Sequence, residues 1–85
     1  MTDLDDLHLP HIEALIEDEG QITLGYLSPV GSVAVASDEH QALAMLRRRT
    51  GESLGELLLR LDAAVCDATD HQVFADEINP PSAGG

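Results

Sequence analysis

Three consecutive arginines, Arg47, Arg48 and Arg49, form the only basic cluster in this sequence of 85 residues. Guanidinium groups bind phosphate and carboxylate oxygens, so the cluster could contact nucleic acid or an acidic partner. Alternatively, it compensates the dipole at the end of a helix and pairs with the chain's own acids. We favour the second interpretation, because three arginines do not offset a formal net charge of -12 without a focused field.

Histidines at His8 and His11 have the spacing H-x-x-H, and Cys66 and His71 could add further ligands. A metal site needs several such ligands converging in a defined geometry, and one loosely placed pair does not supply it. We therefore expect no metal and no other cofactor. Cys66 is instead expected to be a small, partly buried hydrophobic residue.

Adjacent carboxylates occur at Asp5-Asp6 and at Asp76-Glu77. Acid–base catalysis needs such groups in a pocket that separates their pKa values. A chain of this length with two aromatic residues has little material for a pocket of that kind. It also contains no Ser-His-Asp order, no glycine-rich phosphate loop and no zinc signature. The sequence therefore predicts a protein without enzymatic activity.

Acidic residues dominate both flanks of the chain. Residues 1–36 carry seven acids and no base, residues 37–60 carry four acids and four arginines, and residues 61–85 carry five acids and no base. Such a chain repels nucleic acid and anionic membranes and is attracted to basic surfaces. The acidic N-terminus differs from a secretory signal, no apolar run could span a bilayer, and the single cysteine excludes an intramolecular disulfide. We expect a cytoplasmic protein.

The first half of the chain predicts a short helix followed by two strands. Apolar residues at helical spacing after Pro10 predict an amphipathic helix that ends at Gly20. Residues 21–27 and 32–36 alternate in strand fashion on either side of a turn. The two strands could pair as a hairpin within one chain, or one of them could pair with the same strand of a second chain.

Two further helices are predicted in the second half. The first begins after Ser37 and ends at Gly51, with the arginine cluster in its last turn. The second opens with a capping box of the form S-x-x-E at Ser53 and sustains an apolar face as far as Ala68. Leu59 falls outside this face and is a candidate for a subunit contact.

The order of a strand, a helix ending in Thr-Gly and a second helix opening x-Ser-x-x-Glu-Leu resembles the ribbon-helix-helix family. The resembling stretch is residues 32–65, which read SVAVAS, DEHQALAMLRRRTG and ESLGELLLRLDAAV. The resemblance implies an intertwined homodimer whose paired strands enter the DNA major groove. It also implies groove-facing positions at Ser32, Ala34 and Ala36, and a phosphate anchor in the backbone near Ser53.

Two other sets of residues are candidates for protein contacts. Val33 and Val35 on the second strand, together with Leu59, are candidate dimer contacts. The C-terminal segment mixes acids with apolar side chains and could fold onto a basic, grooved partner, as the C-terminal arms of ribbon-helix-helix antitoxins do. Its candidate contact residues are Asp67, Asp70, Val73, Phe74, Asp76, Glu77 and Ile78. Alternatively, the segment is a surface strand or turn that closes the protein's own core.

Together these patterns predict a small single domain of the α+β class that forms a homodimer. Its expected elements are a short N-terminal helix, a β-hairpin or β-ribbon, and a two-helix hairpin. We expect a flexible N-terminus over 1–8, one domain over 9–79 with a ribbon-helix-helix-like core at 32–68, and a disordered tail over 80–85.

The predicted function is macromolecule binding without catalysis. The leading hypothesis is a dimeric regulator or antitoxin-like protein whose acidic flanks bind a basic protein. One alternative is an acidic inhibitor that mimics DNA and occupies a basic groove. Another is a mobile-element cassette protein of no assigned activity. The net charge disfavours DNA as a direct partner, and no membrane partner is expected.

Overall fold

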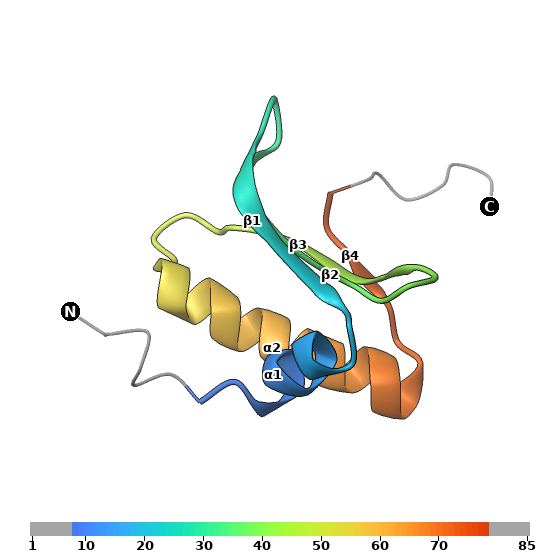
Figure 1. The fold of residues 1–85 in the computed structure, drawn as a ribbon. Coiled ribbons are helices and arrows are strands. Elements are labelled where there is room, and N and C mark those ends of the chain that lie inside the picture. The colour runs from blue at the N-terminus through green and yellow to red at the C-terminus, as the bar shows by residue number, and fades with distance from the viewer. Residues whose placement is uncertain (1–7, 79–85) are drawn as a thin grey trace.

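Two helices and four strands occupy residues 8–78, the part of the chain that the structure describes (Figure 1). In this computed structural model they are α1 (Pro10–Glu17), β1 (Gln21–Leu27), β2 (Gly31–Ser37), β3 (Ala42–Arg47), α2 (Leu54–His71) and β4 (Ala75–Asp76). The predicted tail over 80–85 and all but the last residue of the predicted flexible N-terminus lie outside the described residues. A small single domain of the α+β class is thereby confirmed.

The four strands form one sheet in the order β1-β2-β3-β4. β1 and β2 pair antiparallel, with Gln21 opposite Ser37 and Leu27 opposite Gly31, and β3 continues the antiparallel arrangement on the other side of β2. β4 pairs parallel with β3, because helix α2 first carries the chain back along the sheet (Figure 1). The predicted strands over 21–27 and 32–36 therefore pair within one chain as a hairpin.

The helix predicted between Ser37 and Gly51 is wrong, because these residues form a tight turn followed by strand β3. Ala44 and Leu46 pair with β2 residues that face the helices, and both are buried in the core. The stretch 32–65 thus runs strand, strand, helix, where the resemblance implied strand, helix, helix. The two-helix hairpin is replaced by a strand and helix α2.

Asp38 begins this turn instead of a helix. Its Oδ1 accepts the backbone N–H groups of His40 and Gln41 at 2.7 and 2.8 Å. The same side chain that could cap a helix therefore closes the hairpin between β2 and β3.

The other two helices lie where the sequence places them. In α2, Ser53 Oγ accepts the N–H of Glu56 at 3.1 Å, and the Glu56 carboxylate accepts the N–H of Ser53 at 2.9 Å. This reciprocal pair completes the predicted capping box. Helix α1 begins at Pro10 and ends before Gly20, also as predicted.

Both helices lie on one face of the sheet, and the core fills the space between the two layers (Figure 1). Ala34, Ala36 and Ala44 have no exposed surface, and their small side chains let α2 approach the strands closely. The rest of the core is Ile12, Leu15, Leu43, Leu46, Leu57, Leu61, Val65 and Ala68. Val33 and Val35 alternate with these alanines and lie on the other face of the sheet.

The connections gather at two ends of the sheet. The β1–β2 turn lies at the same end as the β3–α2 loop, since Leu27 pairs with Gly31 and Val33 pairs with Arg47. The α1–β1 connection and the β2–β3 turn lie at the other end, since Gln21 pairs with Ser37. The length of β2 separates these two ends by about 20 Å.

Candidate binding surfaces at the two ends of the sheet

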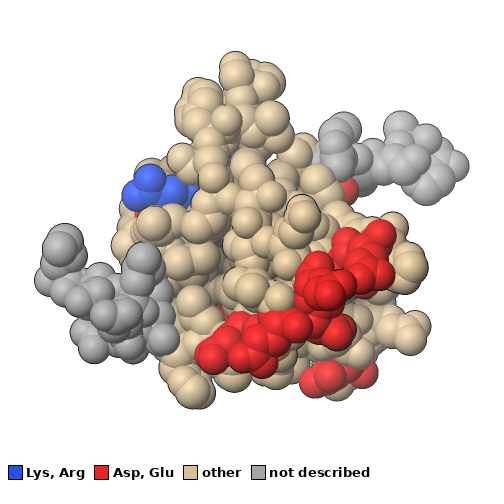
Figure 2. Space-filling model, viewed as in Figure 1, with Lys and Arg blue, Asp and Glu red and all other residues tan. Residues whose placement is uncertain are grey.

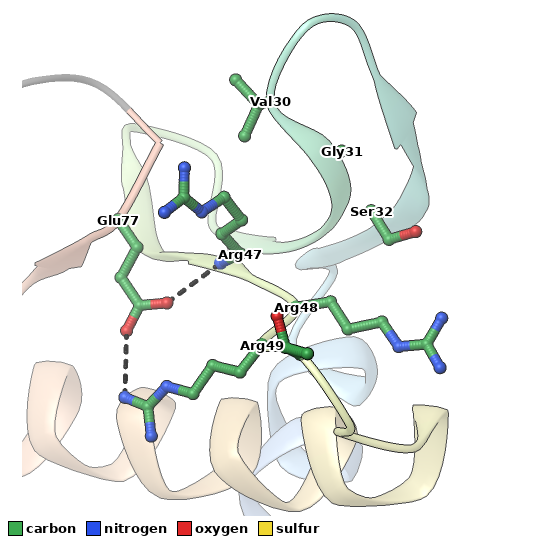
Figure 3. Close-up of a pocket in the computed structure, with 8 residues that line it drawn as sticks. Val30, Gly31, Ser32, Arg47, Arg48, Arg49 and Glu77 are labelled. Atoms are coloured by element: carbon green, nitrogen blue, oxygen red, sulfur yellow. Dashed lines mark hydrogen bonds and ion pairs between the residues drawn. The ribbon is translucent and has the colours of Figure 1, made fainter.

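All the arginines of the chain gather where β3 leads into α2. Arg47, Arg48 and Arg49 are exposed and help to line an open hollow of about 520 Å³. In Figure 3 the Arg47 side chain points toward Val30, that of Arg49 toward Glu77, and that of Arg48 away from both. The prediction that this cluster occupies the last turn of a helix is wrong, because it continues from a strand into a loop. We call Arg47, Arg48, Arg49 and Arg60 the arginine end.

Arg60, on α2, organises this end through contacts with three segments of chain. Its Nε lies 2.8 Å from Glu52 Oε2, and its Nη1 lies 2.8 Å from Glu77 Oε2. Its Nη2 also donates to the carbonyl of Arg47 at 2.8 Å. One guanidinium therefore joins helix α2 to the β3–α2 loop, to the end of β3 and to the segment that follows β4.

These contacts stabilise the charged forms of both carboxyls. The hydrogen bond from Arg60, followed by the backbone N–H of Arg49, lowers the pKa of Glu52 from 4.5 to about 2. The hydrogen bond to Glu52 in turn raises the pKa of Arg60. Partial burial opposes the charged form of Glu77, yet the backbone N–H of Arg47 and the Arg60 guanidinium outweigh it and lower its pKa.

The three consecutive arginines use only part of their donor capacity within the protein. Arg48 Nε donates to the carbonyl of Glu52 at 2.6 Å, and Arg49 Nη2 lies 3.7 Å from Glu77 Oε2. Glu77 sits among them and accepts the backbone N–H of Arg47 at 3.0 Å. The arginine end can therefore hold an anionic group, but Glu52 and Glu77 cancel part of its charge.

Sequence reasoning missed Arg60 as the organiser of this site. Its contact with Glu52 could not be read from helix spacing, because Glu52 precedes the N-cap Ser53 and lies in the β3–α2 loop. No local pattern could have identified Glu77, since it reaches Arg60 only after β4 has paired with β3.

The structure separates the predicted nucleic-acid contacts. Ser32 lines the hollow beside the arginines, but Ala34 and Ala36 are fully buried against the helices and cannot touch a partner. The backbone N–H of Ser53, which the resemblance implied as a phosphate anchor, already donates to Glu56 Oε1 at 2.9 Å. The groove-reading role that the resemblance implied for Ala34 and Ala36 is therefore corrected by their burial.

The predicted dimer contacts do not share one surface. Val33 is buried and Val35 half-buried on the sheet face away from the helices, whereas Leu59 is 46% exposed on α2. Because α2 covers the opposite face, one flat interface cannot include all three residues.

The C-terminal segment closes the protein's own sheet. Ala75 in β4 packs against the core, Asp76 continues the strand, and Ile78 is half-buried. Val73 and Phe74 precede the strand and remain exposed. The alternative that this segment is a surface strand is thus confirmed for Ala75–Asp76.

Acidic side chains gather at the opposite end of the sheet. Asp18, where α1 ends, lines a hollow together with Asp38 and Glu39 of the β2–β3 turn, and Glu17 and Glu19 flank Asp18 in the chain. Figure 2 shows acidic side chains as a continuous band across the lower half of the molecule, away from the arginines at upper left. We call Glu17, Asp18, Glu19, Asp38 and Glu39 the acidic end.

Both helices terminate at the acidic end, which adds to its negative potential. Asp18 lines one hollow with Thr69 of α2, and Asp38 lines another with Thr69 and the exposed Phe74. The C-termini of α1 and α2 therefore point the negative ends of their dipoles to the same place. Asp67 and Asp70, predicted as partner contacts, are exposed on the last turns of α2.

Cys66 is half-buried, as predicted, and its Sγ lies 3.3 Å from Asp70 Oδ2. The hydrogen bond to Asp70, together with partial desolvation and the negative charges nearby, raises the pKa of the thiol. A thiol with a raised pKa is a poor nucleophile at neutral pH. Among residues 8–78, no three His, Cys, Asp or Glu side chains converge in a group that could hold a metal ion.

No helix in the described part of the chain is long and apolar enough to cross a membrane. Comparison with protein-family models gave no match, and comparisons with curated proteins and with solved structures gave none either.

Proposed function

We propose that this chain is a non-enzymatic protein-binding module that docks its acidic end on a basic surface of another protein. The observation that carries this proposal is the convergence of Glu17, Asp18, Glu19, Asp38 and Glu39 with two helix C-termini on an ordered surface. All but three of the chain's 16 acids lie within the described residues, the exceptions being Asp3, Asp5 and Asp6.

Part of the acidic end opposes the stability of α1. Glu17, Asp18 and Glu19 place negative charge at the negative end of the dipole of this helix, and the exposed Glu39 adds a like charge nearby. The ion pairs of Arg49 and Arg60 with Glu52 and Glu77 lie at the other end of the sheet. A local feature that opposes stability is typical of a functional site.

The carboxylate of Asp38 at this end is held in place before a partner arrives. The backbone N–H groups of His40 and then Gln41 lower the pKa of Asp38, so this carboxylate is ionised and fixed in the turn at neutral pH. Fixed charges steer a basic partner and limit the ordering cost of binding.

An exposed aromatic side chain next to these acids favours a protein partner. Phe74 lines a hollow together with Asp38, and Val73 beside it is also exposed. Aromatic anchors surrounded by charged residues are typical of protein interfaces. The partner surface expected is basic with an apolar pocket, such as a groove that otherwise holds the phosphates of a nucleic acid.

Fluorescence anisotropy with a labelled lysine-rich peptide tests the proposal. Wild type should bind at low salt, and binding should weaken as salt rises. The double variant Asp18→Asn with Glu39→Gln should bind at least about tenfold more weakly, which corresponds to ~1.4 kcal/mol.

The matched control is Glu13→Gln with Glu56→Gln, which changes the net charge by the same amount. Glu13 lies in the first turn of α1, and glutamine preserves the capping box at position 56. Equal losses in the two double variants would mean that net charge alone binds the peptide, which would refute the assignment to the acidic end. Salt-sensitive binding to duplex DNA would refute it as well and would point to the arginine end.

A further inference from the structure

Strand β1 is an unprotected edge of the sheet. Its only neighbour in the described sheet is β2, and all its residues except Ile22 are exposed. Natural edge strands are protected by charged side chains, prolines or bulges. β1 has none of these, because residues 21–37 contain no Asp, Glu, Lys, Arg or His, and its pairing with β2 is regular.

We propose that β1 pairs antiparallel with β1 of a second copy of this chain, with Leu24 opposite Leu24. Two four-stranded sheets would then form one continuous sheet of eight strands, with helices on a single face. This inference goes beyond the proposed function and does not depend on it.

Hydrogen-bond directions in the sheet define which groups β1 leaves unpaired. The N–H of Arg48 donates to the carbonyl of Ser32 at 2.9 Å. The backbone N–H and C=O groups of Ser32, and of every second residue after it on β2, therefore point to β3. The backbone groups of Val33 and Val35 therefore point to β1, where they bond with Gly25 and Thr23 respectively.

The remaining residues of β1 point their backbone groups to the free edge. These are Ile22, Leu24 and Tyr26, which alternate with Thr23 and Gly25. With Leu24 opposite Leu24, Ile22 of each copy lies opposite Tyr26 of the other, and each such pair exchanges two hydrogen bonds. All the free N–H and C=O groups of these three residues find partners, and this register overlaps the full length of the strand.

The same register covers the exposed apolar side chains of the strand. Leu24 is 44% exposed and Tyr26 is 76% exposed, and both line a hollow with Leu54 of α2. In the pair, Leu24 would contact Leu24 of the second copy, and Tyr26 would contact its Ile22. Aromatic and branched cross-strand pairs of this kind stabilise sheets.

Charge favours the antiparallel orientation. β1 begins beside the acidic end, since Glu19 and Gly20 directly precede it, and it ends at the turn beside the arginine end. Antiparallel pairing therefore places the acidic end of one copy on the same side as the arginine end of the other. Parallel pairing would place the two acidic ends together, and the repulsion between their like charges opposes that arrangement. The hairpin that would meet the second copy carries no charge (Figure 2).

The opposite edge of the sheet does not offer a second site of this kind. β4 is only two residues long, and the N–H of Arg47 beyond it already donates to Glu77 Oε1 at 3.0 Å. The pairing is therefore expected to close as a two-fold dimer and not to continue as a fibre.

Hydrogen exchange of the wild-type protein tests the pairing without any substitution. As the protein is diluted, the amides of Ile22, Leu24 and Tyr26 should lose at least about tenfold of their protection, while those of Thr23 and Gly25 should keep theirs. Rapid exchange at Ile22, Leu24 and Tyr26 at every concentration would overturn the proposal, as would sedimentation equilibrium that shows only monomer.

Charged variants test the register. Leu24→Lys and Leu24→Glu should each raise the dimer dissociation constant at least about tenfold, because like charges would face each other across the two-fold axis. An equimolar mixture of the two variants should restore the dimer. The matched control is Leu59→Lys, at a leucine of similar exposure on α2, which should leave the dissociation constant unchanged. Loss of the dimer in Leu59→Lys but not in the Leu24 variants would overturn the proposal.

Discussion

The carboxylate of Asp62 accepts the backbone N–H of Ile12 at 2.9 Å, so helix α2 caps the N-terminus of helix α1. Its Oδ1 also accepts the N–H of His11 at 2.9 Å, and Asp62 is buried between the two helices. Helix α1 has no cap of its own, because Leu9 stands at the capping position. A residue remote in sequence thus satisfies the donors that a serine or aspartate normally satisfies locally.

Replacing Asp62 with alanine should lower the free energy of unfolding by about 1–3 kcal/mol, because two buried N–H groups lose their acceptor. Asp62→Asn keeps an acceptor oxygen and should cost less, about 1 kcal/mol, mainly through the lost charge at the helix dipole. Urea unfolding followed by circular dichroism measures both. Equal costs for the two variants would show that the charge alone is responsible.

Replacing Arg60 with alanine should lower the free energy of unfolding by about 2 kcal/mol, because Glu52 and the carbonyl of Arg47 lose their main partner. Arg47→Ala removes an exposed guanidinium from the same end and should change stability by less than about 0.5 kcal/mol. Thermal unfolding of the two variants compares them directly. Similar midpoints for both would contradict the organising role of Arg60.

Stability should fall in acid as Glu52 is protonated. Its pKa is about 2 in the folded protein and 4.5 ordinarily. Its contribution to the free energy of unfolding is therefore complete above pH 4.5 and is lost as the pH falls toward 2. Asp38, Glu56 and Glu77, whose pKa values are also lowered, change stability in the same direction. In urea titrations across this range, Glu52→Gln should show a smaller loss with acid than wild type. An unchanged slope would exclude Glu52 as a contributor.

Gly20 is expected to be intolerant of a side chain. A Cβ there would lie 2.5 Å from Leu15 Cγ and 2.8 Å from the Leu15 carbonyl oxygen. Gly20→Ala should therefore cost about 1–3 kcal/mol, since α1 and its connection to β1 must move apart. Gly25→Ala is the matched control, because a Cβ at position 25 meets no atom within 4 Å. Comparable unfolding midpoints for the two alanine variants would contradict this account.

Local signals correctly predicted helix α2, the short helix α1 and the two strands β1 and β2, but they left open whether these strands pair within one chain. The capping box at Ser53 and the turn between β1 and β2 each act within a few residues, so tertiary context does not alter them. Strand β3 was missed because Ala42–Arg47 consists of good helix formers. Its position between β2 and β4 supplies two partners along the sheet, and that pairing overrides helix propensity.

The two candidate surfaces were only partly predictable. The arginine cluster is visible in the sequence, but its contacts with Arg60 and Glu77 depend on how the sheet and α2 pack together. The acidic end combines Asp18 and Asp38, which come from separate turns and meet only when Gln21 pairs with Ser37. Charge composition predicted acidic flanks, but it did not predict that Asp18 and Asp38 would lie side by side.

Because β4 has only two residues, its release from the sheet would change the balance of charge at the arginine end. Glu77, directly after the strand, helps to anchor it, because its N–H donates to the carbonyl of Met45 at 2.7 Å and its carboxylate accepts from Arg60. Detachment of so short a strand should leave the hairpin and α2 in place, as a local opening below global unfolding. Each opening removes one negative charge from among four guanidiniums. An anion that bound there would compete with Glu77 and prolong the open state, so ion concentration and strand release are thermodynamically coupled.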